Sequence, residues 1–195
     1  GFYAKSRVQS LLEYELPAQL QHLGAEVALQ LTPSLQVSRS LASNSFVQRW
    51  IQRGMSEAEL PLLVEEMAVI SQQLNAGAVF LAGNDGSTIN YYHFKNGEFN
   101  RRRIQRENTQ DAWYFNYLAS QLPYELNLDT NAFTGTQLQM FVNYTGSAVN
   151  SNGEPVSVAG VGLDMLQLAK MISSYRLGEH GRASLANKDG LVEVR

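Results

Sequence analysis

The chain has 195 residues, of which 44% are hydrophobic and 17% are charged. This length allows one complete domain of ~100–200 residues plus part of a second, and the apolar share is large enough to offset the entropy of ordering a core. The net charge of −3 comes from 15 basic and 18 acidic residues. We therefore expect no nucleic-acid partner, because no basic surplus is available for a phosphate backbone.

Residue content also excludes several kinds of reactive site. The chain has no cysteine, which rules out a cysteine nucleophile, a thiolate metal site and a disulfide scaffold. The three histidines, His22, His93 and His180, are far apart and show no HExxH spacing, so we expect neither a metal nor a cofactor. The longest apolar runs are far below the ~18 residues of a membrane span. Any membrane contact is expected through segments outside this sequence.

The first 75 residues are predicted to be helical. Apolar residues recur every three or four positions between Val8 and Val27, which is typical of one long amphipathic helix. Proline removes a backbone donor, so Thr32-Pro33-Ser34 is expected to break this helix. Helices are then predicted over residues 35–41, 44–54 and 56–75. Ser43 or Asn44 should cap the second of these, and an S-x-x-E capping box at Ser56 should open the third.

From residue 78 the pattern changes to antiparallel hairpins. Asp85-Gly86 and Asn96-Gly97 each lie between β-prone segments, and such turns favour two-residue hairpin loops because they tolerate positive φ. Strands are predicted over residues 79–81, 88–92, 93–95, 98–99, 124–128, 137–144 and 156–161, with further turns at Gly135 and Asn152-Gly153. Helices are predicted over residues 112–121 and 164–175. The arginines at 101–103 are expected in a solvated loop, and His93 in a strand near the rim.

This order predicts an α+β protein with an antiparallel sheet covered by helices. The segment Leu81–Gly86 is similar to Leu185–Gly190, and both place an Asp-Gly turn between two strands. We therefore expect two tandem modules, the second of them truncated. The predicted organisation is an N-terminal helical stalk (1–75), a membrane-distal module (76–175) and the beginning of a membrane-proximal module (176–195).

The order of these elements resembles the double-Cache family, PAS-like extracytoplasmic sensor domains of bacterial membrane signal transducers. The resemblance covers nearly the whole chain. It rests on the order and spacing of short segments that are individually unspecific: NSFVQRWIQRG (44–54), AVFLAGNDGSTINYY (78–92), DAWYFNYL (111–118), YELNLD (124–129), MFVNY (140–144), VAGVGLD (158–164) and SSYRLGEHGRASLANKDG (173–190).

The resemblance implies a ligand pocket in the distal module, lined by aromatic and acidic residues. The aromatic pair of the family corresponds to Trp113 and Tyr114, and the acids that hold a ligand ammonium group correspond to Asp129 and Asp164. Where amino-acid-binding members have an arginine for the ligand carboxylate, this chain has Asp111. This replacement of an arginine by Asp111 implies a small cation, such as an amine, as the ligand.

A second departure from the family and several structural alternatives remain open for these residues. Where the family has a tyrosine two positions before the first acid, this chain has Asn127. Trp113 and Tyr114 are equally compatible with a role in the core, because large aromatic residues dominate most cores. Asp111 and Asp164 are placed to cap helices, and Asp129 to bond its own backbone in a turn.

Three functions follow from the sequence. The first is the input domain of a bacterial receptor that carries a cyclase, kinase or chemoreceptor output, located in the periplasm as part of an inner-membrane protein. This reading includes a small-molecule ligand, no catalysis by this part, and a homodimer through the N-terminal helix. The second is a ligand-free module that binds another protein. The third is a hydrolase that uses Asp129 and Asp164 as paired carboxylates.

Overall fold

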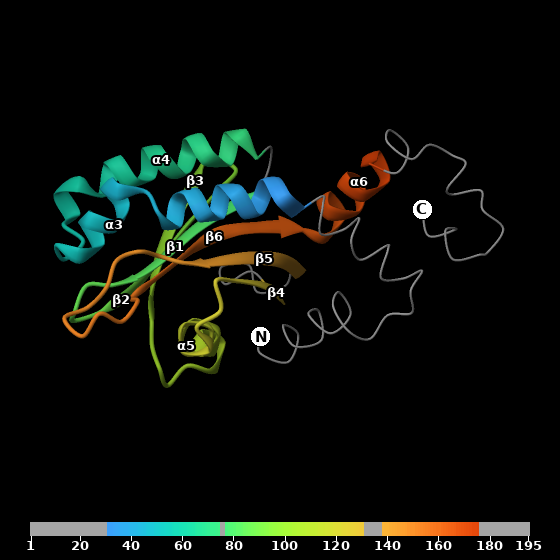
Figure 1. Cartoon of the computed structure of the whole chain (residues 1–195). Helices are drawn as coiled ribbons and strands as arrows, with labels where there is room; N and C mark the ends of the chain where they lie inside the picture. Colours follow the sequence, from blue (N-terminus) through green and yellow to red (C-terminus); the bar gives the residue numbers. More distant parts are fainter. Residues whose placement is uncertain (1–30, 75–76, 131–137, 176–195) are drawn as a thin grey trace.

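The computed structural model describes residues 31–74, 77–130 and 138–175. Six strands form one sheet in the order β3-β2-β1-β6-β5-β4, and every neighbouring pair is antiparallel (Figure 1). The strands are β1 (Ala78–Asn84), β2 (Ile89–Lys95), β3 (Glu98–Ile104), β4 (Tyr124–Thr130), β5 (Leu138–Thr145) and β6 (Ser157–Asp164). The predicted antiparallel sheet is confirmed.

Helices cover both faces of this sheet, which confirms the α+β class (Figure 1). The helix of residues 31–42 and α4 (Leu60–Gln73) lie over one face, with α3 (Ser45–Gln52) and the short 3-10 turn η1 (Glu57–Glu59) at its end. The opposite face carries the 3-10 turn η2 (Thr109–Asp111) and α5 (Ala112–Ser120). The helix α6 (Met165–Tyr175) follows β6 directly.

The face beneath α4 is an ordinary apolar core. Trp50, Leu63 and Met67 are at most 1% exposed and pack with Leu81 and Tyr92 of the sheet. The apolar cluster beside it includes Leu31, Val142 and Val161. Burial of large apolar side chains contributes ~1.5–3 kcal/mol each, so this face supplies much of the stability of the domain.

The predicted hairpin turns at Asp85-Gly86 and Asn96-Gly97 are confirmed. Asp85 Oδ1 accepts hydrogen bonds from the backbone N–H groups of Ser87 (2.8 Å) and Thr88 (2.9 Å), and Gly86 has a φ of +101°. In the second turn, Asn96 and Gly97 have φ values of 53° and 78°. These conformations are the ones that favour Asn and Gly, which explains why the sequence pattern identified both turns.

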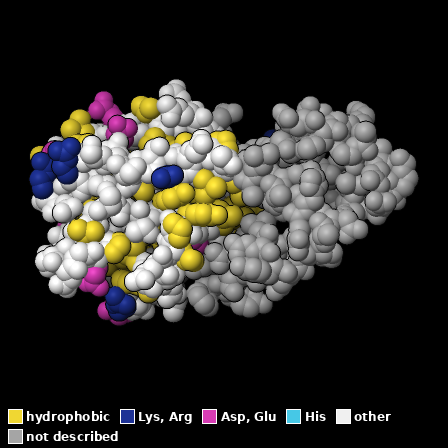
Figure 2. All heavy atoms as spheres, in the orientation of Figure 1, with side chains coloured by type: hydrophobic (Ala, Val, Ile, Leu, Met, Phe, Trp, Pro, Cys, Tyr) yellow, Lys and Arg dark blue, Asp and Glu magenta, His cyan; other side chains and the backbone are white. Residues whose placement is uncertain are grey.

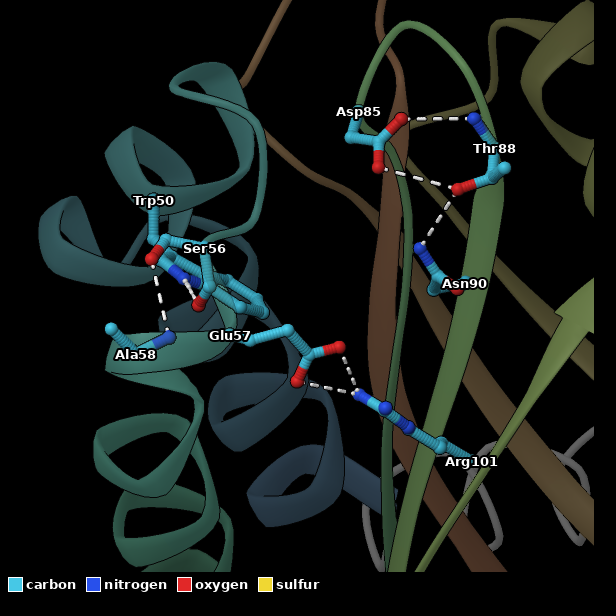
Figure 3. Close-up of polar contacts among 8 residues, drawn as sticks. All are labelled: Trp50, Ser56, Glu57, Ala58, Asp85, Thr88, Asn90 and Arg101. Atoms are coloured by element: carbon cyan, nitrogen blue, oxygen red, sulfur yellow. Dashed lines mark hydrogen bonds and ion pairs between the residues drawn. The ribbon is translucent and has the colours of Figure 1, made fainter.

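Two of the predicted helix starts are confirmed, the second with a difference. The Val47 N–H donates to Asn44 Oδ1 at 2.9 Å, which makes Asn44 the cap of α3. Ser56 accepts from the Ala58 N–H at 3.2 Å and caps η1 rather than α4 (Figure 3). The Ser56 carbonyl also accepts from Trp50 Nε1 at 2.9 Å, so this turn is fastened to α3.

Two predictions were wrong, and one on the first helices is not tested. Thr32–Ser34 lie in the helix of residues 31–42, ahead of the predicted start of the second helix at residue 35. The predicted break between this helix and the preceding one stays a prediction, because the residues before Leu31 lie outside the described structure. The arginines at 101–103 belong to β3 rather than to a loop, and Arg101 Nη1 contacts Glu57 Oε1 at 2.7 Å (Figure 3). His93 lies in a strand, β2, as predicted, but it is 4% exposed and therefore buried rather than near the rim.

Other predictions fall outside the described residues. These are the amphipathic stripe between Val8 and Val27, the turn at Gly135 and the second module over residues 176–195. The boundaries of the three predicted domains therefore stay predictions.

Candidate functional site

The sheet face that carries α5 differs from the apolar face by holding polar side chains in rows. Side chains alternate between faces along a strand, so residues opposite each other in neighbouring strands share a face. In one row Glu125 is opposite Asn143, which is opposite Gly160, and Gly160 is opposite Phe80. Phe80 packs with the aromatic residues of α5, which fixes this row on the α5 face.

Two further rows lie on the same face, towards the ends of β4, β5 and β6. Asn127 is opposite Phe141 in the second row, and Phe141 packs in the α5 cluster. In the third row Asp129 is opposite Gln139, and Gln139 is opposite Asp164. The topology therefore brings three sequence-predicted positions, Asn127, Asp129 and Asp164, to one end of one face.

Polar groups on this face are deeply buried, which is unusual for the inner surface of a sheet. Gln139 is fully buried, Asn143 is 1% exposed and Asn127 is 3% exposed. Both polar atoms of the Asn143 amide, Oδ1 and Nδ2, lack a hydrogen-bond partner, and so does Asn127 Oδ1. Buried polar atoms in native proteins are nearly always hydrogen-bonded, so these amides are suited to bind something that the chain does not provide.

Asp164 already binds an ammonium group. Its Oδ1 accepts from Lys95 Nζ at 2.9 Å and from Gln139 Nε2 at 2.7 Å. The two charged side chains are 14% and 23% exposed, so water screens the pair only partly. The carboxylate is on the same face as the buried amides, opposite Gln139, one row from Asn127 and two rows from Asn143. Its position is compatible with a cationic ligand group.

Asp111 does not cap α5. Although it is the residue before this helix, its side chain makes no capping hydrogen bond. Instead, one carboxylate oxygen contacts Arg102 Nη2, and the other accepts from the Gln105 N–H at 2.8 Å. The predicted cap is wrong, because a fully buried carboxylate is stabilised more by a guanidinium than by a helix N-terminus.

The two predicted aromatic residues have different surroundings. Trp113 is partly buried, and its ring lies edge-on to Phe80 and Tyr91 with centroids 5.9 Å away in each case. Tyr114 is 2% exposed, and its hydroxyl donates to the Val156 carbonyl at 2.7 Å. Burial raises the pKa of Tyr114 well above its usual value. Tyr114 therefore has a core role, whereas Trp113 lies where the core meets the polar rows.

Sequence reasoning missed Lys95, His93, Gln139 and Asn143. His93 stacks on Tyr91 with ring centroids 6.3 Å apart, on the same face as Phe80 opposite it. Burial lowers the pKa of His93 to about 4, and the nearby charge of Lys95 acts in the same direction. The imidazole is therefore neutral near pH 7. The side chain of Asp129 lies outside the described part of the structure, and only its strand position is known.

Within the described ranges, no group of three or more His, Asp and Glu side chains could hold a metal ion. None of the described helices is both long and apolar enough to cross a membrane. Figure 2 shows the Lys and Arg side chains of one face as small separate groups rather than as one continuous basic surface.

No protein-family model matches the sequence. Among solved structures, the sensory domain of the Campylobacter jejuni chemoreceptor Tlp3 is similar, with a TM-score of 0.55 and 10% identity over 88% of this chain and 68% of that chain. The Tlp3 ligand-binding domain in complex with L-norvaline gives a TM-score of 0.53 at 15% identity, over 89% of this chain and 64% of that chain. The extracellular domain of vpHK1S-Z8, assigned as a histidine kinase, gives a TM-score of 0.52 at 15% identity, over 86% of this chain and 60% of that chain.

This chain therefore spans between 60% and 68% of the length of these three chains. At such low identities the similarity concerns the fold alone. The three similar structures are a sensory domain, a ligand-binding domain and an extracellular domain, and their fold agrees with the one that the double-Cache resemblance implies. The chain has the α+β, PAS-like fold of these extracellular sensor domains.

Proposed function

We propose that this chain is the extracytoplasmic ligand-sensing domain of a bacterial transmembrane receptor whose output is a cyclase, a histidine kinase or a chemoreceptor. Support comes from the fold shared with the Tlp3 sensory domain, which has been solved with isoleucine and with L-norvaline. The proposal includes no catalytic step. It places the domain in the periplasm, as part of an inner-membrane protein.

The observation that carries the proposal is the pair of buried amides on the α5 face. Asn127 and Asn143 are at least 97% buried, yet three of their polar atoms make no hydrogen bond. Leaving such atoms unsatisfied costs ~1–3 kcal/mol each, and a bound solute with hydrogen-bonding groups would remove that cost. A module that served only to bind another protein would have no need for this buried polarity.

The finer form of the proposal is that the solute carries an ammonium group. Asp164 supports this because its carboxylate accepts a hydrogen bond from an ammonium, that of Lys95. Asp129 lies two strands away in the same row and would add a second carboxylate. Trp113 borders the rows and would shield the ligand from water. The remaining predicted residues, Tyr114 and Asp111, would act as supports rather than as ligand contacts.

Signalling would require that the solute binds one arrangement of the domain better than another, because a ligand shifts an equilibrium only by its differential affinity. We propose that the arrangement is transmitted through the helix that the sequence predicts for the N-terminal residues, and that a homodimer forms on this helix. Gel filtration with light scattering should give the mass of a dimer, and a monomer at high protein concentration would contradict this part.

A thermal-shift screen of the protein tests the function. The panel contains amines, amino acids, neutral polyols and carboxylates, and a ligand that binds the native state raises the Tm with concentration. We expect amines or ammonium-bearing zwitterions to raise it most. If only carboxylates or polyols do so, the amine class is wrong and the sensing function stands. If no solute acts, the ligand-free module is favoured.

A further inference from the structure

We infer that Lys95 is a built-in competitor of the ligand: its ammonium group occupies the amine position at Asp164 and sets how strongly the site binds amines. This inference rests on the proposed function and identifies a residue that determines specificity. Nothing in the sequence pattern marked Lys95, and the structure alone brings it to Asp164.

The ion pair joins two strands that are not neighbours in the sheet. Lys95 lies at the end of β2 and Asp164 at the end of β6, and β1 lies between these two strands. The Lys95 side chain therefore crosses the face of β1 before its Nζ contacts Asp164 Oδ1 at 2.9 Å. Across this gap, Ala78 of β1 is opposite Gly162 of β6, and both are too small to block the path.

The coordination of Asp164 Oδ1 explains why a ligand must compete. Gln139 Nε2 donates to this oxygen at 2.7 Å, and Lys95 Nζ supplies the charged donor. The Gln139 side chain is fully buried on β5, whereas the Lys95 ammonium group sits at the end of a flexible four-carbon side chain. An incoming ammonium can therefore replace the Lys95 group while keeping the Gln139 hydrogen bond.

A Lys95 side chain displaced from Asp164 would have another acidic residue nearby. In the β2–β3 pair Lys95 is directly opposite Glu98, which is exposed at the edge of the sheet. Opposite charges at such positions attract each other. Lys95 thus has one acidic partner inside the site, Asp164, and a second acidic residue opposite it at the edge of the sheet, Glu98. Ligand binding would favour the arrangement in which Lys95 turns towards Glu98.

The size of the effect follows from the fraction of molecules in which the site is open. When only a fraction is competent, the apparent Kd equals the intrinsic Kd divided by that fraction. If Lys95 occupies Asp164 in about nine molecules out of ten, its removal tightens amine binding about tenfold. The affinity for neutral solutes that do not bind Asp164 should not change when Lys95 is removed.

The test compares glycinamide, which carries an ammonium group, with glycolamide, which has a hydroxyl in its place. Isothermal titration calorimetry at mildly acidic pH, where the amine is protonated, measures the Kd of each compound for the wild type and for Lys95→Met. The Met side chain retains the apolar stem of lysine without its charge. We expect Lys95→Met to bind glycinamide about tenfold or more tightly and glycolamide unchanged. Lys170→Met removes the same charge from an exposed position of α6 and should have no effect.

The inference is overturned if Lys95→Met binds glycinamide no better than the wild type, whether both bind or neither does. Adding Asp164→Asn to Lys95→Met should abolish the gain, and a gain that persists would also overturn it. Should Lys95→Met fail to fold, Lys95→Gln retains a polar end group and carries the same expectations. The thermal-shift screen on the wild-type protein distinguishes failure of the Lys95 inference from failure of the sensing function. A neutral ligand found there supports the sensing function even when Lys95 has no role.

Discussion

The carboxylate of Asp111 is fully buried and forms an ion pair with Arg102, nine positions earlier in the chain. The second oxygen of Asp111 accepts from the Gln105 N–H at 2.8 Å. The pair therefore joins β3 to the turn that begins α5, and it fixes this helix over the polar rows. At this position the family resemblance implied a ligand contact; in the structure the carboxylate contacts Arg102 and the Gln105 N–H.

Replacement of Asp111 should be strongly destabilising. Removing one partner of a buried ion pair leaves the other charge uncompensated, and the usual cost is ~3–5 kcal/mol. Because the Arg102 side chain is 23% exposed, we expect Asp111→Ala to lower the free energy of unfolding by about 2–3 kcal/mol in urea denaturation. Arg101→Ala breaks the exposed pair with Glu57 and should cost less than about 1 kcal/mol. Equal losses for the two variants would contradict this role.

The polar rows leave little room for side chains on β6, and Gly160 makes this testable. A Cβ at this position would lie 1.9 Å from the Val142 carbonyl oxygen and 2.8 Å from Phe80. We expect Gly160→Ala to destabilise the domain by about 1–3 kcal/mol, as overpacking does. Gly77→Ala is the matched control, because its Cβ would have no neighbour closer than 3.5 Å. Similar Tm values for the two variants would show that the sheet face is less tightly packed.

Asn143 should favour binding at the expense of stability. Its side-chain amide makes no hydrogen bond in the structure, so Asn143→Val removes two unsatisfied polar atoms and should raise the free energy of unfolding by about 1 kcal/mol or more. The same variant should weaken binding of the solute found by the thermal screen at least tenfold. Asn90→Val, on β2, removes an amide that bonds Thr88 Oγ1 at 3.3 Å and should leave binding unchanged. A large stability loss in Asn143→Val would indicate a structural role instead.

His93 should make the protein less stable in acid. Its pKa is 6.5 in a model peptide and about 4 in the native state, mainly because of burial. Between these two values the unfolded chain binds a proton that the native protein does not. The free energy of unfolding should therefore fall as the pH drops from about 6.5 to about 4, by up to about 3 kcal/mol.

His93→Gln should lack this part of the pH dependence. Urea denaturation of the wild type and of His93→Gln between pH 4 and pH 6.5 gives the free energy of unfolding of each protein. In the difference between the two free energies, the contributions of groups that titrate alike in both proteins cancel. Lys95→Met should raise the His93 pKa, because the charge of Lys95 helps to lower it. Parallel curves for wild type and His93→Gln would contradict the assignment.

Local sequence signals predicted the framework well because its turns depend on single residues. Asp85-Gly86 and Asn96-Gly97 form the hairpins at which they were predicted, and Asn44 caps α3. The arginines at 101–103 were wrongly predicted to lie in a loop, because β3 forms by pairing with β2. Local propensity contains no information on that pairing.

The candidate site was only partly predictable. Asn127 and Asp164 were identified through a resemblance, and strand register alone shows that they share a face. The alternation of Leu126 and Leu128 with polar residues in β4 indicates two distinct faces, but it suggests that the polar face meets water. That this face is buried depends on α5, and that Lys95 reaches Asp164 depends on the strand order.

The most direct test of the central claim is an NMR titration with the solute that gives the largest Tm rise in the screen. The account predicts that the side-chain amide signals of Asn127 and Asn143 shift and saturate together with the indole N–H signal of Trp113. If the solute binds while these three signals stay unchanged and others shift, the ligand site lies elsewhere and the account is wrong.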